Sequence, residues 1–117
     1  MTTILIVDDD PSTRFVLRLI LEREGYKILE AGNGAAALDM LRPDPLPDIV
    51  MTDLMMPVMT GVELVRRLRS EPRTAKMRIV VVSGNPEVAQ SLGVDAIVTK
   101  PFSAPKLAER IRAIVAL

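Results

Sequence analysis

ILIVDD, at residues 4–9, carries the clearest signal of how this chain folds. Four consecutive apolar residues are typical of a strand that is covered on both faces, as in parallel sheets with helices on either side. Two carboxylates, Asp8 and Asp9, follow the apolar run directly. The sequence therefore predicts a buried strand over residues 4–7 that ends in an acidic pair.

The same arrangement recurs along the chain. Further strands are predicted over residues 26–30, 49–52, 79–82 and 96–98. Helices are predicted from Pro11 to just before Gly25 and over residues 35–41, 61–70, 87–92 and 104–115. Five strand-then-helix units predict an α/β fold, with a five-stranded parallel sheet and helices on both faces. No repeat or linker interrupts the order, so residues 1–117 are expected to form a single domain.

Composition excludes several classes of function. Lys and Arg number 15 and so do Asp and Glu, and this neutral balance argues against a general nucleic-acid binder. The chain has no Cys and no His, which excludes disulfides, thiolate or histidine zinc sites and Ser-His-Asp triads. No signal peptide or membrane span is present in the sequence. We therefore expect a cytoplasmic protein that does not bind a membrane.

Polar residues follow the predicted strands at the point where each strand ends. They are Asp8 and Asp9 after the first strand, Asp53 after the third, Ser83 after the fourth and Lys100 after the fifth. The carboxyl ends of parallel strands are where ligands bind in such folds. Three carboxylates brought together repel one another unless a hard cation neutralises them. With no His or Cys available, oxygen ligands favour Mg2+, Mn2+ or Ca2+, and a small octahedral ion that keeps waters and contacts a phosphate fits Mg2+ best.

The remaining polar groups suit a phosphoryl group. Lys100 supplies a compact positive charge, and the Ser83 hydroxyl and the Gly84 backbone N–H supply hydrogen bonds. A carboxylate nucleophile beside a metal, a lysine and a hydroxyl describes formation of an aspartyl phosphate on Asp53. Positioning and charge neutralisation carry such a reaction, so no dedicated protein base is required.

These motifs resemble those of the response regulator receiver domains of bacterial two-component systems, including chemotaxis regulators. The matching motifs are VDD at residues 7–9, DLMMP at 53–57, TG at 60–61, SG at 83–84 and KPF at 100–102. The resemblance covers essentially the whole chain and implies a flavodoxin-like sheet of order 2-1-3-4-5.

The resemblance also implies roles for the site residues. Asp53 would be the phosphoacceptor, and Mg2+ would be held by Asp8, Asp9, Asp53 and the Met55 backbone carbonyl. Ser83 would move toward the phosphoryl group and Lys100 would pair with it, with a cis bond between Lys100 and Pro101.

The resemblance implies partners as well. A sensor histidine kinase or a phosphotransfer protein would donate the phosphoryl group. The phosphorylated state would alter contacts with a downstream protein that the sequence does not name. We expect a monomer or weak dimer without direct nucleic-acid binding.

Several residues have a simpler structural interpretation. Asp10 before Pro11 is expected to cap the first helix rather than to bind metal. Gly32-Asn33-Gly34 is interpreted as a turn, because it lacks the lysine of a phosphate-binding loop. Met55, Met56 and Met59 are expected to pack the loop rather than to bind a soft metal. Arg66, Arg67 and Arg69 are expected to form a solvated helix face.

Two features depart from the family pattern. Ile97 occupies a position, three residues before Lys100, where receivers usually carry an aromatic side chain. The spacing from Ser83 to Lys100 is 17 residues, shorter than in the family, so the fourth helix is expected to be short or irregular. Both departures affect the surface through which the family usually signals and dimerises.

Other functions compete with a stand-alone receiver that lacks an output domain. The chain could be a receiver excised from a longer regulator, or a pseudo-receiver that binds partners without being phosphorylated. A hydrolase acting through an aspartyl phosphate would typically carry a second Asp two residues after the nucleophile. Met55 occupies that position, so we expect a switch and not an enzyme that turns over external substrates.

Overall fold

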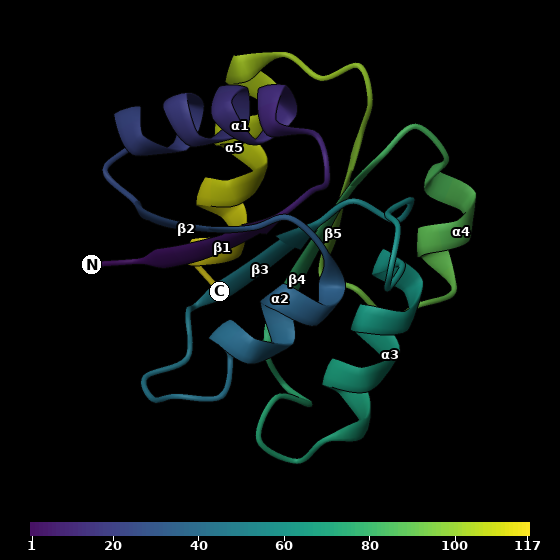
Figure 1. Cartoon of the computed structure of the whole chain (residues 1–117). Coiled ribbons are helices and arrows are strands. Elements are labelled where there is room, and N and C mark those ends of the chain that lie inside the picture. Colours follow the sequence, from purple (N-terminus) through teal and green to yellow (C-terminus); the bar gives the residue numbers. More distant parts are fainter.

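Five parallel strands form the centre of the molecule (Figure 1). A computed structural model describes residues 1–117. The strands are β1 (Thr3–Val7), β2 (Lys27–Ala31), β3 (Ile49–Thr52), β4 (Arg78–Ser83) and β5 (Ala96–Thr99), in the order β2-β1-β3-β4-β5. This confirms the predicted flavodoxin-like sheet, and places β1 and β3 side by side in its interior.

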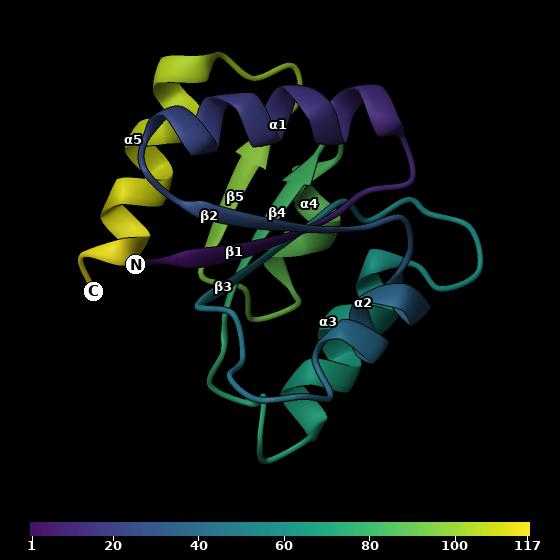
Figure 2. The same ribbon diagram turned by 60° about the vertical axis from the view of Figure 1, so that its left-hand side comes forward.

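Helices cover both faces of this sheet, as Figure 2 shows. They are α1 (Pro11–Arg23), α2 (Gly34–Met40), α3 (Gly61–Ser70), α4 (Pro86–Gln90) and α5 (Ala104–Val115). α1 and α5 pack on one face, whereas α2 and α3 pack on the other and α4 joins them beside β5. No helix has the length and apolar character needed to cross a membrane.

The strands are apolar without interruption because each faces two cores. In β1, Ile4 and Ile6 lie in the core under α1 and α5. Leu5 and Val7 lie in the core under α2 and α3. Side chains of a strand alternate between the faces of a sheet, so only a continuous apolar run fills both cores.

The helix boundaries follow local capping chemistry. The Asp10 side chain accepts the Ser12 N–H at 3.0 Å, which confirms its predicted role as the cap of α1. Asn33 caps α2 through the Ala36 N–H at 2.8 Å, so Gly32 and Asn33 form the bend before the helix and Gly34 begins it, one residue into the predicted turn. The expected short fourth helix is also confirmed, because α4 has only 5 residues.

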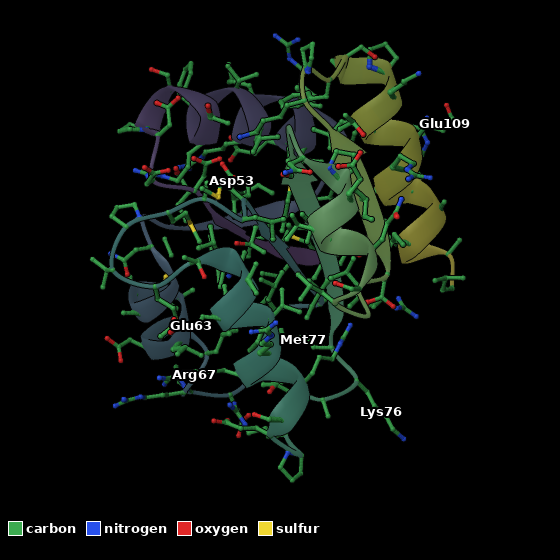
Figure 3. All side chains as sticks on the ribbon, turned by 90° about the vertical axis from the view of Figure 1, so that its right-hand side faces the viewer. Asp53, Glu63, Arg67, Lys76, Met77 and Glu109 are labelled. Atoms are coloured by element: carbon green, nitrogen blue, oxygen red, sulfur yellow. The ribbon has the colours of Figure 1, made fainter.

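The arginines of α3 correct one prediction. Arg66 and Arg67 are exposed as expected, and Figure 3 shows Arg67 on the outer side of the helix, far from Asp53. Arg69 instead reaches the two loops that precede β4 and β5. Its guanidinium donates to the carbonyls of Ala75, Met77 and Gly93 and to the Asp95 carboxylate. The expectation of a solvated face was therefore wrong for Arg69, since a guanidinium carries enough donors to join two loops.

We predict that Arg69→Met destabilises the fold by about 2 kcal/mol, because partly buried carbonyls lose their donor. Arg67→Met is the matched control on the same helix, with an expected change within about 0.5 kcal/mol. The free energy of unfolding from urea denaturation measures both. Equal stability of the two variants would contradict the structural role of Arg69.

Candidate functional site

Sheet register brings the acidic residues together at the carboxyl edge. Val7 of β1 pairs with Thr52 of β3, so the next residues, Asp8 and Asp53, emerge side by side. The Asp53 N–H donates to the Val7 carbonyl at 3.0 Å, which extends this alignment by one residue. Carboxylate oxygens of Asp8, Asp9 and Asp53 all lie within 4.8 Å of one another. The three predicted carboxylates thus form one cluster.

Asp8 is the buried member of this cluster, with only 2% of its surface exposed. Its Oδ1 accepts the Asp10 N–H at 2.9 Å, but its Oδ2 has no hydrogen-bond partner. The nearest cation, the Lys100 Nζ, is 3.7 Å from Oδ2, too far for a hydrogen bond. Burial raises the pKa of Asp8, against the opposing effects of the Asp10 N–H and the Lys100 charge. An unpaired buried oxygen among carboxylates is a fitting ligand for a hard divalent cation.

Asp53 is held from both sides. Its Oδ2 accepts a hydrogen bond from the Lys100 Nζ at 2.8 Å. Its Oδ1 accepts the N–H groups of Leu54 and Met55 at 2.6 and 3.3 Å. Burial acts to lower the pKa of Lys100, but the hydrogen bond and charge of Asp53 and the charge of Asp8 outweigh it and raise that pKa. Lys100 therefore stays protonated beside Asp53 at neutral pH.

Ser83 lies beside Lys100, as its position at a strand end predicts, and Gly84 follows it in the chain. The Ser83 carbonyl accepts the Lys100 backbone N–H at 2.9 Å, which ties the end of β4 to the end of β5. The buried Ser83 hydroxyl accepts the Asn85 N–H at 3.0 Å rather than contacting Asp53. Gly84 is exposed, and a Cβ there would meet no atom within 4 Å. Their contacts with a phosphoryl group stay a prediction.

Gly61 permits the close approach of α3 to Asp53. A Cβ at residue 61 would lie 1.9 Å from the Asp53 carbonyl oxygen, so only glycine fits. The Gly61 N–H also donates to the Leu54 carbonyl at 2.9 Å, which closes the loop after β3. The sequence marked this glycine as a helix start and as part of the TG motif, but its steric role depends on how α3 packs.

The methionines of this loop separate into two groups. Met56 and Met59 are buried, which confirms their packing role. The Met55 side chain is 77% exposed, so it does not pack the loop as expected. Its N–H bonds to Asp53, while its carbonyl as a metal ligand stays a prediction. The Lys100-Pro101 bond is cis, as the resemblance implied.

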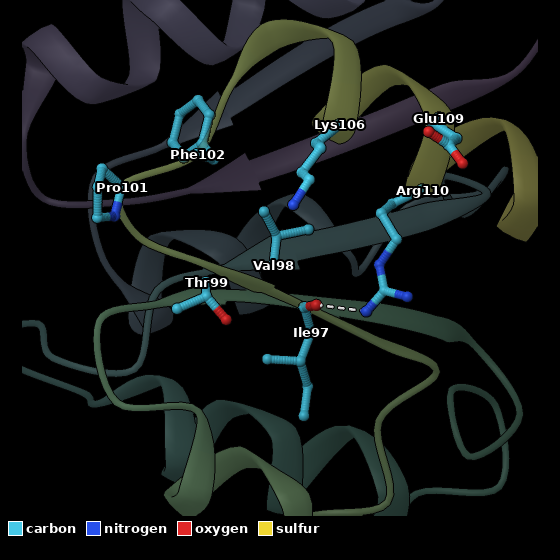
Figure 4. A pocket seen from close by; sticks show the side chains of 8 residues that line it. All are labelled: Ile97, Val98, Thr99, Pro101, Phe102, Lys106, Glu109 and Arg110. Carbon is cyan, nitrogen blue, oxygen red and sulfur yellow. Dashed lines mark hydrogen bonds between the residues drawn. The ribbon is translucent and has the colours of Figure 1, made fainter.

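Ile97 lies at a groove between β5 and α5, with a volume of about 380 Å³ (Figure 4). The groove is lined by Ile97, Val98, Thr99, Pro101, Phe102, Lys106, Glu109 and Arg110. The Arg110 guanidinium donates to the Ile97 carbonyl at 2.7 Å. The Ile97 side chain packs against the small apolar cluster of Leu54, Val81 and Ala89. This position therefore links β5 to the residue after Asp53 and to α4 without an aromatic ring.

The chain belongs to the response regulator receiver domain family, which matches residues 4–112. It is 36% identical over 116 residues to the response regulator GtcR of Aneurinibacillus migulanus, covering 95% of this chain and 46% of that protein. It is also 36% identical to the phosphate regulon transcriptional regulatory protein PhoB of Pseudomonas aeruginosa, covering 97% of this chain and 51% of PhoB. The chain thus spans about half the length of these curated relatives.

A solved structure matches over almost the whole of both chains. The response regulator TrrA of Thermotoga maritima, in complex with Mg2+-BeF, has a TM-score of 0.86 and 30% identity. The match covers 97% of this chain and 99% of that one. The receiver fold predicted from the sequence is confirmed by this comparison.

We predict that Asp8→Asn stabilises the metal-free protein by about 1 kcal/mol or more, because it removes a buried charge whose Oδ2 is unpaired. The raised pKa means that the native state binds the proton more tightly than the unfolded state. Ionisation of Asp8 therefore costs stability as pH rises above the unfolded pKa of 3.8. Urea denaturation with a chelator measures the gain at neutral pH.

The gain from Asp8→Asn should shrink as pH falls toward the unfolded pKa, where Asp8 is protonated in both states. Asp9→Asn is the matched control, since Asp9 is exposed and its loss should change stability less. A destabilised Asp8→Asn variant at neutral pH would contradict the cost assigned to this carboxylate.

Proposed function

We propose that this receiver domain, residues 1–117, is a phosphoacceptor switch of a two-component phosphorelay, with Asp53 as the acceptor. The observation that carries the proposal is the Asp53 carboxylate, hydrogen-bonded to Lys100 at 2.8 Å and clustered with the unpaired Asp8 Oδ2. Asp53 therefore lies between the Lys100 ammonium group and the carboxylates of Asp8 and Asp9. That arrangement suits a nucleophile whose product carries more negative charge than its reactant.

Mg2+ is the cofactor we propose, with Mn2+ as the alternative. Asp8, Asp9 and Asp53 would hold it, together with the Met55 backbone carbonyl. When bound, such a cation neutralises charge on the oxygens of the transferring phosphoryl group. The Mg2+-BeF complex of TrrA, a relative of the same family, supports the assignment. The Asp8 Oδ2 supports it independently, because this buried oxygen has no hydrogen-bond partner within the chain.

The reaction follows from the groups around Asp53. A carboxylate oxygen of Asp53 forms a bond to phosphorus while the bond from phosphorus to the donor's histidine nitrogen breaks. The electron pair of that bond stays with the leaving imidazole, which takes its proton from solvent. Lys100 would move its hydrogen bond from Asp53 Oδ2 to a phosphoryl oxygen, and Ser83 and Gly84 would donate to the others. No side chain has to act as a general base, since the nucleophile is already a carboxylate.

Such a switch requires two protein partners, one that donates the phosphoryl group and one that receives the signal. We propose a sensor histidine kinase or a phosphotransfer protein as the donor and a downstream protein as the receiver of the signal. Large apolar side chains are exposed on α1 and on the loop after β3, among them Phe15 at 60% and Val58 at 83%. Exposed apolar surface of this kind is typical of protein contacts. We propose that the chain acts in the cytoplasm through contacts with proteins, as a monomer or weak dimer and without direct nucleic-acid binding.

The output route is expected to run through the end of β4. The Lys100 backbone N–H donates to the Ser83 carbonyl, so a displacement of one residue would also displace the other. Ile97 packs with Leu54, which directly follows Asp53, and with Ala89 of the short α4. We propose that these aliphatic contacts replace the aromatic switch of other receivers.

We propose that the chain is a switch rather than an enzyme that acts on external phosphoesters. Met55 lies two residues after Asp53, where such enzymes would need an acid. Since the chain spans about half of GtcR and PhoB, the receiver could equally serve within a longer regulator.

Intact-mass measurement after incubation with acetyl phosphate and Mg2+ tests the proposal. We expect wild type to gain one phosphoryl group and Asp53→Asn to gain none. Asp48→Asn is the matched control, because Asp48 precedes the same strand at the opposite end of the sheet. It should be labelled like wild type. Labelling of Asp53→Asn would sink the assignment, and an unlabelled wild type would indicate a pseudo-receiver.

A further inference from the structure

Arg14 of α1 reaches back to the acidic pair. Its Nη1 donates to the Asp8 backbone carbonyl at 2.6 Å, and its Nε donates to the Glu30 carboxylate at 3.2 Å. The Arg14 side chain is only 20% exposed. We propose that Arg14 is a positioning residue that orients Asp8 and Asp9 for the cation, an inference that rests on the function proposed above.

The contacts of Asp8 show what Arg14 contributes. The Asp8 N–H donates to the Ala31 carbonyl at 3.1 Å, and the Asp8 Oδ1 accepts the Asp10 N–H at 2.9 Å. Arg14 binds the Asp8 carbonyl. Every polar atom of Asp8 therefore has a hydrogen-bond partner except Oδ2, the atom left for a ligand. Without Arg14, the main-chain carbonyl would be free to turn.

The Asp8 carbonyl belongs to the peptide group that joins Asp8 to Asp9. Because this group is planar, a hydrogen bond to its oxygen also fixes the orientation of the Asp9 backbone N–H. One side chain thereby constrains two neighbouring carboxylates, one buried and one exposed. A cationic donor makes this hydrogen bond stronger than a neutral one would be.

Arg14 is itself held in place by a second strand. Glu30 of β2 accepts from Arg14 with Oε1 and from Arg18 with Oε2, at 3.2 and 2.7 Å. The guanidinium charge is thus compensated by Glu30, and its hydrogen bond is directed at a carbonyl rather than at the carboxylates of the cluster. This geometry favours a role in orientation over a role in charge balance.

The two roles predict opposite changes in Mg2+ affinity when Arg14 is replaced. Removing a nearby positive charge would tighten Mg2+ binding if Arg14 acted only through its charge. Removing a group that orients the ligands would weaken binding. Partners of this kind behind metal ligands typically contribute about tenfold or more to affinity.

The test is Mg2+ titration of the whole chain, followed by amide chemical shifts, for wild type, Arg14→Met and Arg18→Met. We expect Arg14→Met to raise the dissociation constant about tenfold. Arg18→Met is the matched control, since Arg18 also pairs with Glu30 but does not contact Asp8. It should leave Mg2+ affinity within about twofold of wild type.

Arg14→Lys provides a second variant, which should recover part of the affinity and which replaces Arg14→Met if that variant does not fold. Unchanged or tighter Mg2+ binding in the folded variant would overturn the positioning role. Equal weakening by Arg18→Met would overturn it as well, because the effect would then belong to the Glu30 ion pairs. A wild type that binds no Mg2+ would instead refute the proposed function.

Discussion

The site depends on one buried carboxylate oxygen that the protein leaves without a hydrogen bond. Asp8 is 2% exposed, and its Oδ2 lies among two further carboxylates and 3.7 Å from Lys100. A group in this position costs free energy in the folded chain. Lys100 offsets part of that cost, and a divalent cation would offset more. The arrangement therefore couples occupancy of the site to the stability of the whole domain.

The parallel topology of the sheet holds the three carboxylates together despite their mutual repulsion. The acidic residues follow β1 and β3, which are neighbours in the sheet, and Lys100 follows β5. Their backbones are anchored by sheet hydrogen bonds, while their side chains leave the sheet at one edge. The rigid core below the edge holds the like charges together against their repulsion. Gly61 completes this support by letting α3 contact the Asp53 carbonyl directly.

Most of the fold and the main site residues follow from the sequence, because both depend on short-range patterns. Apolar runs such as residues 4–7 and 79–82 mark strands buried on both faces, and the polar residues after them share one edge. The structural roles of Arg69 and Arg14 could not be predicted from the sequence, and the physical reason is the same for both. Each binds backbone carbonyl groups of segments that only folding brings near. Because every residue has a backbone carbonyl, the residue type does not show which carbonyl will be bound.

The melting temperature of wild type with and without Mg2+ shows whether the Asp8 Oδ2, which has no hydrogen bond, serves as a ligand for a cation. NaCl at matched ionic strength controls for screening of the carboxylates. A ligand that binds only the folded state stabilises it in proportion to the logarithm of its concentration once the site is saturated. We expect MgCl2 to raise the melting temperature progressively beyond the NaCl control, and equal melting temperatures in the two salts would show that the site holds no Mg2+.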